Sequence, residues 1–254
     1  MSVARTEFSQ DAIAYHASLA GTWEQRYRKS SFQMRQNVLL NALHGWDLAG
    51  TLWLDAGCGT GALARWLTTR GCSVLGVDAA FEMIAAANQS AESQDFSDRL
   101  RFVRVQTIAR LALDDRSLDG ILCSSVLEYV QDPSGCLTEF ARVLKPGGLL
   151  LVSIPNRNSV VRQMQLACHR LGTLLGQPWC KFLEYSCHQY SRLEFERLLQ
   201  QAGFSSEKLL PLGSPLPGLA QRSRHWAPLL MFVARKMPEN ISTELNRGSR
   251  HRQC

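Results

Sequence analysis

The chain has 254 residues, of which 45% are hydrophobic and 20% are charged. These proportions are typical of a folded globular protein, and they exclude a disordered, collagen-like or coiled-coil chain. The 28 basic and 22 acidic residues give a net charge of +6, a modest excess that does not by itself indicate a nucleic-acid partner.

The longest apolar stretches, such as 149–152 and 229–234, are far too short to span a bilayer as a helix. The first twenty residues contain charged side chains and no continuous apolar core, so we expect no secretory signal. None of the eight cysteines forms a C-x-x-C pair, which favours free thiols over a disulfide framework or a zinc site. We therefore expect a cytoplasmic protein.

Two helices are predicted at the start of the chain, over 9–29 and 31–45. Arg35 lies on the apolar stripe of the second helix, where a guanidinium is costly unless it is paired. Arg35 is therefore either the partner of a cofactor carboxylate or an arginine whose head reaches water at the domain edge. We expect residues 1–50 to form an N-terminal helical lid.

From residue 51 onward, short apolar runs alternate with amphipathic segments. The predicted strands are 52–54, 73–77, 101–105, 120–123, 149–154, 207–212 and 229–235, and the predicted helices between them are 62–69, 79–88, 136–144 and 192–202. This order predicts an α/β fold with a doubly wound, mostly parallel seven-stranded sheet over 51–236. Residues 145–148 should separate a helix from the fifth strand. Residues 155–187 should form an inserted helical cap, and 237–254 a flexible basic tail.

A glycine-rich loop, Asp-Ala-Gly-Cys-Gly-Thr-Gly, begins at Asp55 between the first strand and the next helix. Its glycines allow a sharp turn and the close approach of a cofactor. Because Gly57, Gly59 and Ala62 also satisfy a loose dinucleotide fingerprint, the loop alone leaves a nicotinamide cofactor open. Asp55 favours a cofactor with a cationic amino-acid end, and Asp78 can accept both hydroxyls of a ribose.

Three further motifs follow in order: Val-Asp at 77–78, Leu-Asp-Gly-Ile at 118–121 and Leu-Lys-Pro-Gly-Gly at 144–148. With the glycine loop, they make about residues 20–210 resemble class I S-adenosylmethionine-dependent methyltransferases of the type 11 group. The resemblance implies the Rossmann-like methyltransferase fold and S-adenosylmethionine as cofactor. The chain most resembles the ubiquinone-biosynthesis O-methyltransferases, notably at Ile-Pro-Asn-Arg-Asn, whereas 20–85 also resembles a magnesium-protoporphyrin methyltransferase.

The same resemblance implies a set of cofactor-binding residues. They are Arg35, Asp55, Gly57, Gly59, Gly61, Asp78, Ala79, Met83, Thr107, Ile108 and Ser124. The glycines would surround the methionyl part, and the carbonyl near Ser124 would meet its amine. Ala79 and Met83 would lie near the adenine or ribose, although Met83 could equally serve helix packing. Thr107 stands where many relatives carry Asp, and Tyr27 is a second partner for the cofactor.

An acceptor hydroxyl reacts faster once it has lost its proton, so we expect a general base. His188, just before the last helix, is the first choice, and Glu128, Tyr129 and His169 are alternatives. The ubiquinone-type enzymes have an acidic-x-x-acidic-His cluster suited to a divalent cation. This chain instead reads Ser-Val-Leu-Glu-Tyr at 125–129 and loses hard ligands. We expect no metal site and metal-independent transfer.

The sequence thus predicts O-methylation of a small, lipophilic or aromatic hydroxylated molecule. Alternatives are C-, N- or carboxylate methylation of a quinone, tetrapyrrole or natural product, a nicotinamide oxidoreductase, a binding module, or a methyltransferase of RNA or protein. A nucleic-acid partner is not expected, because the Asn/Asp-Pro-Pro-Tyr/Phe signature of base N-methylation is missing after the fourth strand. The amphipathic segment 159–175 is either a lid that also touches a membrane surface or a helix packed on the sheet edge. The sequence does not indicate the oligomeric state.

Overall fold

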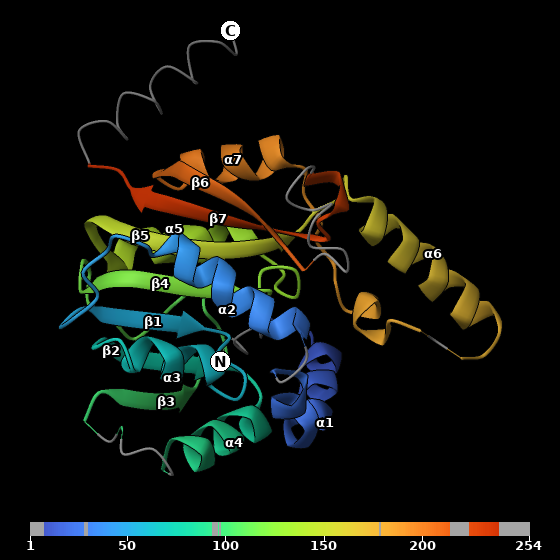
Figure 1. The fold of residues 1–254 in the computed structure, drawn as a ribbon, viewed down its shortest axis with the longest axis horizontal. Helices are drawn as coiled ribbons and strands as arrows, with labels where there is room; N and C mark the ends of the chain where they lie inside the picture. Colours follow the sequence, from blue (N-terminus) through green and yellow to red (C-terminus); the bar gives the residue numbers. More distant parts are fainter. Residues whose placement is uncertain are drawn as a thin grey trace, which may run out of the picture.

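A seven-stranded sheet forms the centre of the molecule (Figure 1). The computed structural model describes residues 8–27, 30–92, 96, 98–177, 179–213 and 224–238. The strands are β1 (Leu52–Ala56), β2 (Ser73–Asp78), β3 (Leu100–Arg104), β4 (Leu118–Ser124), β5 (Leu144–Pro155), β6 (Phe204–Leu212) and β7 (Leu229–Lys236), in the order β3-β2-β1-β4-β5-β7-β6. The first five are parallel, and β7 runs antiparallel to both β5 and β6. The predicted doubly wound, mostly parallel fold is confirmed.

Seven α-helices and two short 3₁₀ helices are present in the described ranges. They are α1 (Gln10–Tyr27), α2 (Ser30–Ala42), α3 (Ala62–Thr68), α4 (Phe81–Glu92), α5 (Pro133–Val143), α6 (Val160–Leu174), η1 (Lys181–Glu184), α7 (Arg192–Gln201) and η2 (Arg224–Trp226). Local signals explain several boundaries. Ser159 caps α6 by accepting a hydrogen bond from the backbone N–H of Arg162, and Ser191 forms a reciprocal capping box with Glu194 at α7.

One local prediction at β5 is wrong. Residues 145–148 do not separate α5 from the strand, because β5 already begins at Leu144, which pairs with Leu118 of β4. The Pro-Gly-Gly motif is therefore part of the strand itself. A register shift between Leu118 and Gly120 accommodates this irregular start.

The central strands are buried on both faces, as their apolar runs require, whereas the edge strands β3 and β6 have exposed residues. Leu150 and Val152 of β5 belong to a core cluster that includes residues of α5 and α7. Leu149 and Leu151 point to the opposite face and pack in a second cluster with residues of α2, α3 and α4. Helix α1 does not enter either layer fully, since its Ala20 packs against α4 near the carboxyl ends of the strands.

The sheet has a topological switch point between β1 and β4. Chain connections lead from β1 toward β2 on one side and from β4 toward β5 on the other. In open α/β sheets, ligands bind in the crevice beyond the carboxyl ends of such strands. The fold thus places the glycine loop, the end of β2 and the end of β4 around one crevice.

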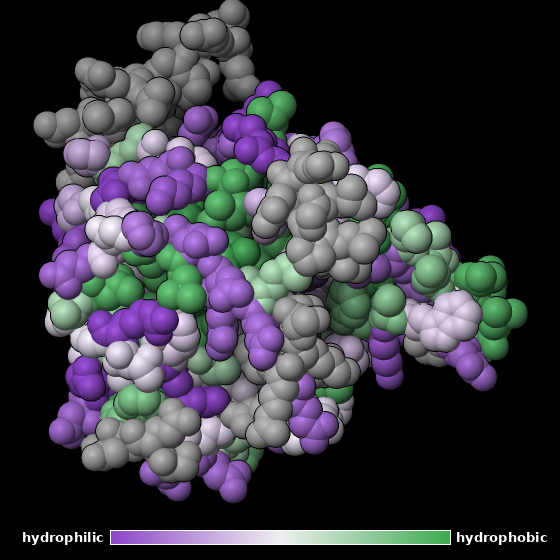
Figure 2. All heavy atoms as spheres, viewed as in Figure 1, coloured by the Kyte–Doolittle hydropathy of each residue, from purple (hydrophilic) through white to green (hydrophobic). Residues whose placement is uncertain are grey.

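Helix α6 extends away from the sheet with η1 beside it (Figure 1). Met164, Leu171 and Leu174 on its apolar face are 59%, 51% and 84% exposed, whereas the Arg162 side chain is 2% exposed. In Figure 2, hydrophobic atoms cover the far end of this projection. Of the two alternatives for segment 159–175, packing on the sheet edge is therefore wrong, because α6 projects from the sheet and turns its polar side, including Arg162, inward. Within the described residues, no helix is long and apolar enough to cross a membrane.

Candidate active site

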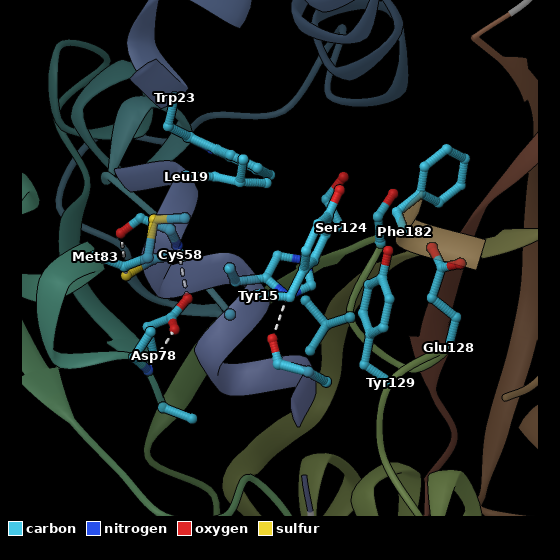
Figure 3. Close-up of a pocket in the computed structure, with 18 of the residues that line it drawn as sticks. Tyr15, Leu19, Trp23, Cys58, Asp78, Met83, Ser124, Glu128, Tyr129 and Phe182 are labelled. Atoms are coloured by element: carbon cyan, nitrogen blue, oxygen red, sulfur yellow. Dashed lines mark hydrogen bonds between the residues drawn. The ribbon is translucent and has the colours of Figure 1, made fainter. Parts of the chain in front are cut away.

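A cavity of about 330 Å³ opens at the carboxyl ends of β1, β2 and β4 and is walled by α1 and α6. Figure 3 shows Asp78, Met83 and Cys58 together at one end of it, and Glu128, Tyr129 and Phe182 at the other. The lining includes these residues implied by the sequence: Arg35, Asp55, Gly57, Gly59, Asp78, Ala79, Met83, Ile108, Ser124, Glu128 and Tyr129. We call the two ends the Asp78 end and the Glu128 end.

The glycine loop packs too tightly to accept side chains. Gly57 and Gly59 have φ values of 75° and 54°, in the left-handed region that favours glycine. A Cβ at Gly57 would lie 2.2 Å from Cγ2 of Val126, and one at Gly59 would lie 3.2 Å from Nε1 of Trp23. The N–H of Gly57 also donates to the carbonyl of Val77 over 2.8 Å, which fixes the loop against β2. The loop is thus a rigid floor that exposes backbone to the cavity.

Asp78 ends β2 and is held on both carboxylate oxygens. The N–H of Gly59 donates to Oδ2 and the N–H of Ala80 donates to Oδ1, each over 2.9 Å. Burial raises the pKa of Asp78, and these two backbone donors partly oppose that shift. A carboxylate fixed in this way presents two acceptors with a set orientation, which suits a pair of neighbouring hydroxyls.

Asp55 lies at the end of β1 and is 2% exposed. Its Oδ2 has no hydrogen-bond partner. Burial, with a smaller contribution from the charge of Asp78, raises the pKa of Asp55 to about 7. Two carboxyl groups this close favour a ligand with positive charge, because a cation lowers the cost of keeping both ionised.

The Glu128 end contains a buried ion pair. Nη2 of Arg162 lies 3.2 Å from Oε2 of Glu128, with the two side chains 2% and 3% exposed. The hydroxyl of Ser186 donates to the same Oε2 over 2.5 Å and accepts from Nη2 of Arg162 over 2.7 Å. Burial raises the pKa of Glu128, and the partners Arg162 and Ser186 oppose that shift. The carboxyl is therefore held in place but remains a usable proton acceptor.

Residues 54–152 match the family model described as Methyltransferase domain. This segment is a methyltransferase domain. It contains the glycine loop, Asp78 and Glu128 and supplies about half of the residues that line the cavity. The resemblance to S-adenosylmethionine-dependent methyltransferases, predicted from the sequence, is confirmed.

The chain is similar to the ubiquinone biosynthesis O-methyltransferase of Psychrobacter arcticus, at 29% identity over 170 residues. That match covers 65% of this chain and 63% of the relative, less than two thirds of the relative's length.

Two solved structures have a similar fold. Magnesium protoporphyrin IX methyltransferase from Synechocystis PCC 6803, with bound SAH, has a TM-score of 0.62 at 19% identity and covers 89% of this chain and 100% of its own. The cyclase SpnF has a TM-score of 0.62 at 20% identity and covers 82% of this chain and 83% of its own. At these identities the likeness shows the fold alone, and function must be argued from the site.

Helix α1 supplies cavity residues that the sequence analysis missed. Tyr15, His16, Leu19 and Trp23 all line the cavity above the methyltransferase domain. The His16 ring meets the Tyr129 ring edge to face, with 4.7 Å between centroids. Their spacing of one to two helical turns is the signal that could have identified them.

Helix α6 and the segment after it also contribute lining that the sequence analysis missed. Arg162, Gln165 and Phe182 close the Glu128 end from outside the methyltransferase domain. No sequence pattern marks Arg162 as buried, because it stands on the polar face of an amphipathic helix. Its burial depends on Glu128, 34 residues earlier in the chain.

Three predicted residues do not line the cavity. Gly61 adopts a φ of 75° at the start of α3, where a Cβ would lie 2.3 Å from the Phe102 ring, so its role is close packing. The Thr107 hydroxyl accepts a hydrogen bond from the N–H of Ala109 over 3.1 Å and shapes its own turn. His188 instead stacks on Tyr190, with ring centroids 6.1 Å apart.

Two predicted residues remain, His169 and Tyr27. His169 lies 2.7 Å by its Nδ1 from the carbonyl oxygen of Trp179 and is not part of the lining. The side chain of Tyr27 lies outside the described residues. Across the described ranges, no group of three or more His, Cys, Asp or Glu side chains could hold a metal ion.

Proposed function

We propose that the chain is an S-adenosylmethionine-dependent methyltransferase that methylates a hydroxyl group of a small, lipophilic or aromatic molecule. The observation that carries this proposal is the fixed Asp78 carboxylate at one end of a cavity whose other end holds Glu128 and Tyr129. A nucleoside at the Asp78 end and an acceptor at the Glu128 end would meet between them.

The residues fit this cofactor. Asp78 has two fixed acceptors for the ribose hydroxyls, and the loop at Gly57 and Gly59 has no room for side chains. The unpartnered Oδ2 of Asp55 favours binding of a cationic ligand. The two carboxyl groups of Asp55 and Asp78 beside the loop would repel the pyrophosphate of a nicotinamide cofactor. Ala79, Met83 and Ile108 supply the apolar wall for a base, and Ser124 adjoins the methionyl end.

When bound, S-adenosylmethionine supplies an activated methyl group on a positively charged sulfur. The chain then has to orient the acceptor and keep water out. Leu19 and Trp23 cover the cavity from α1, and Tyr129 and Phe182 form an aromatic wall at the acceptor end. Glu128, whose pKa is raised by burial, accepts the proton of the acceptor hydroxyl.

The test of this proposal has two steps. Calorimetry should detect S-adenosylhomocysteine binding and no NAD binding. Incubation of the protein with methyl-labelled S-adenosylmethionine and an extract of the source cells should then label a small molecule, identified by its mass. Glu128→Gln should retain S-adenosylhomocysteine binding and lose turnover by roughly 100-fold or more. NAD binding without S-adenosylhomocysteine binding would overturn the proposal.

We also propose that the apolar face of α6 contacts an anionic membrane surface. Met164, Leu171 and Leu174 are exposed on one face, and the helix contains no acidic residue. The exposed Arg170 on the same helix adds positive charge. A helix with this composition can lie in a membrane interface while its inner face covers a cavity, which would suit delivery of a lipophilic acceptor.

We propose a cytoplasmic location for the enzyme. The cysteines of the described ranges are free, and Cys58, Cys72, Cys123 and Cys136 are buried among apolar side chains. Free buried thiols of this kind are typical of a reducing compartment.

A further inference from the structure

Two polar atoms on the inner face of α6 are buried without a hydrogen-bond partner. They are Nε of Arg162 and Oε1 of Gln165. Both residues line the cavity, and their spacing of three residues puts them on the same side of the helix. Because a buried unpaired donor or acceptor is costly, such a pair at a cavity marks groups that a ligand satisfies.

The Arg162 side chain is built into the cavity wall. It is 2% exposed, and its Nη2 is fixed by Glu128 and Ser186 at 3.2 and 2.7 Å. The face of the guanidinium lies against Phe182, with 5.6 Å from Cζ to the ring centroid. These contacts hold the guanidinium in one orientation, and its Nε–H is buried without an acceptor.

The charges at this end favour an anion. The guanidinium of Arg162 forms an ion pair with the Glu128 carboxylate. Arg35 also lies close enough to lower the pKa of Glu128, which adds positive potential to the same end. A carboxylate is a strong acceptor for an arginine N–H in such surroundings.

Gln165 sets a second requirement for the chemistry of the ligand. Its Oε1 accepts hydrogen bonds, so the group that meets it must carry an O–H or N–H donor. Since Gln165 lies one turn from Arg162, that donor must stand close to the oxyanion on the same molecule. The surrounding wall of Tyr129 and Phe182 suits an aromatic ring.

We propose that Arg162 and Gln165 recognise an aromatic acid with a hydroxyl next to its carboxylate. The carboxylate accepts from Nε of Arg162, and the neighbouring hydroxyl donates to Oε1 of Gln165. These two side chains bind the part of the acceptor that is not methylated and so select the acceptor. This inference rests on the proposed function, because it deepens the acceptor end of the same cavity.

The test uses the full chain saturated with S-adenosylhomocysteine and three small probes, with binding measured by ligand-observed NMR. Salicylate carries both groups, benzoate lacks the hydroxyl, and salicylamide lacks the charge. Wild-type protein should bind salicylate most tightly. Arg162→Lys keeps a positive charge for Glu128 but has no Nε donor. It should therefore weaken the affinity for salicylate by about 10- to 100-fold and leave the affinity for salicylamide unchanged.

Gln165→Met keeps the side-chain length without the acceptor and does not disturb the buried ion pair. It should reduce salicylate affinity to that of benzoate and leave benzoate unchanged, which keeps the test valid if Arg162→Lys fails to fold. Arg170→Lys and Gln163→Met, at exposed positions of α6, are the matched controls and should bind all three probes as wild type does.

The inference is overturned if wild-type protein does not bind salicylate, if it binds salicylamide equally well, or if neither variant changes salicylate binding. S-adenosylhomocysteine binding is measured first and separately in each protein. Loss of that binding in wild type would contradict the proposed function, whereas its retention with no discrimination among the probes would contradict only the role of Arg162 and Gln165.

Discussion

The backbone N–H of Gly59 donates to Oδ2 of Asp78 over 2.9 Å. This bond joins the loop after β1 to the end of β2, so the two cofactor-facing elements hold each other in place. The carboxylate is therefore oriented before any ligand arrives, and the loop cannot move away from it without breaking the bond. Such preorganisation reduces the cost of binding.

Replacing Asp78 with asparagine should weaken S-adenosylhomocysteine binding by about 100-fold, because hydrogen bonds to a charged acceptor are worth about 1.5–3 kcal/mol each. Calorimetry measures the affinity, and the melting temperature shows whether the fold is retained. Asp114→Asn, at an exposed position, is the matched control and should bind as wild type does. Unchanged affinity in Asp78→Asn would remove the ribose assignment.

The raised pKa of Asp55, about 7, predicts a pH dependence for cofactor binding. Below pH 7 the carboxyl is mostly neutral, and above it the negative charge attracts a cationic ligand. Affinity for S-adenosylmethionine should therefore rise between pH 6 and pH 8, and Asp55→Asn should flatten this profile. A wild-type profile that matches the variant would contradict the role of Asp55.

The raised pKa of Asp55 also predicts how the free energy of unfolding of the ligand-free protein changes with pH. Because the folded-state pKa of Asp55 is raised from 3.8 to about 7, the folded state holds this proton more tightly than the unfolded state does. The tighter binding of this proton adds about 4 kcal/mol to the free energy of unfolding below pH 4, and this contribution is lost as the pH rises to 7. At pH 8, Asp55→Asn should be more stable than wild type in urea unfolding, and at pH 4 the two should converge.

The glycine loop should reject even a methyl group. Gly57→Ala places a Cβ 2.2 Å from Cγ2 of Val126 at a φ of 75°. Gly45→Ala is the matched control, because Gly45 has a φ of 85° with nothing within 4 Å of the added Cβ. The control should lower the free energy of unfolding by about 1–2 kcal/mol, because of backbone strain alone. Gly57→Ala should lower it by about 1–3 kcal/mol more, because of overpacking, and should abolish cofactor binding. Equal stability of the two variants in urea unfolding would contradict the steric argument.

Methyl transfer should be independent of divalent metal ions. The Glu128 carboxylate already accepts hydrogen bonds from Arg162 and Ser186, and a guanidinium beside it repels a cation. Turnover with an identified acceptor should therefore be the same with excess chelator and with added magnesium. Loss of turnover on chelation, restored by magnesium, would show this prediction to be wrong.

The apolar face of α6 should bring the protein to vesicles that contain anionic lipid. Leu171→Gln and Leu174→Gln together should abolish co-flotation, because both side chains are exposed on that face. Leu193→Gln, an exposed leucine on α7, is the matched control and should float as wild type does. Failure of wild type to float with or without anionic lipid would remove the membrane proposal.

The sequence alone determined the order and type of the elements. Apolar runs marked the central strands of the sheet, and the motif at Asp55 with Asp78 marked the Asp78 end of the cavity. These signals are local, because a buried parallel strand, a tight glycine turn and a strand-end carboxylate each depend on a few neighbouring residues. These features could therefore be predicted from short segments of the sequence.

Only the tertiary structure decided the Glu128 end of the cavity. His188 was predicted as the general base but stacks on Tyr190 outside the cavity, whereas Arg162, which no sequence pattern marked, is buried against Glu128. An amphipathic pattern gives two faces of a helix without saying which one meets the protein. That choice depends on contacts between residues far apart in the chain, here the ion pair between α6 and the segment after β4.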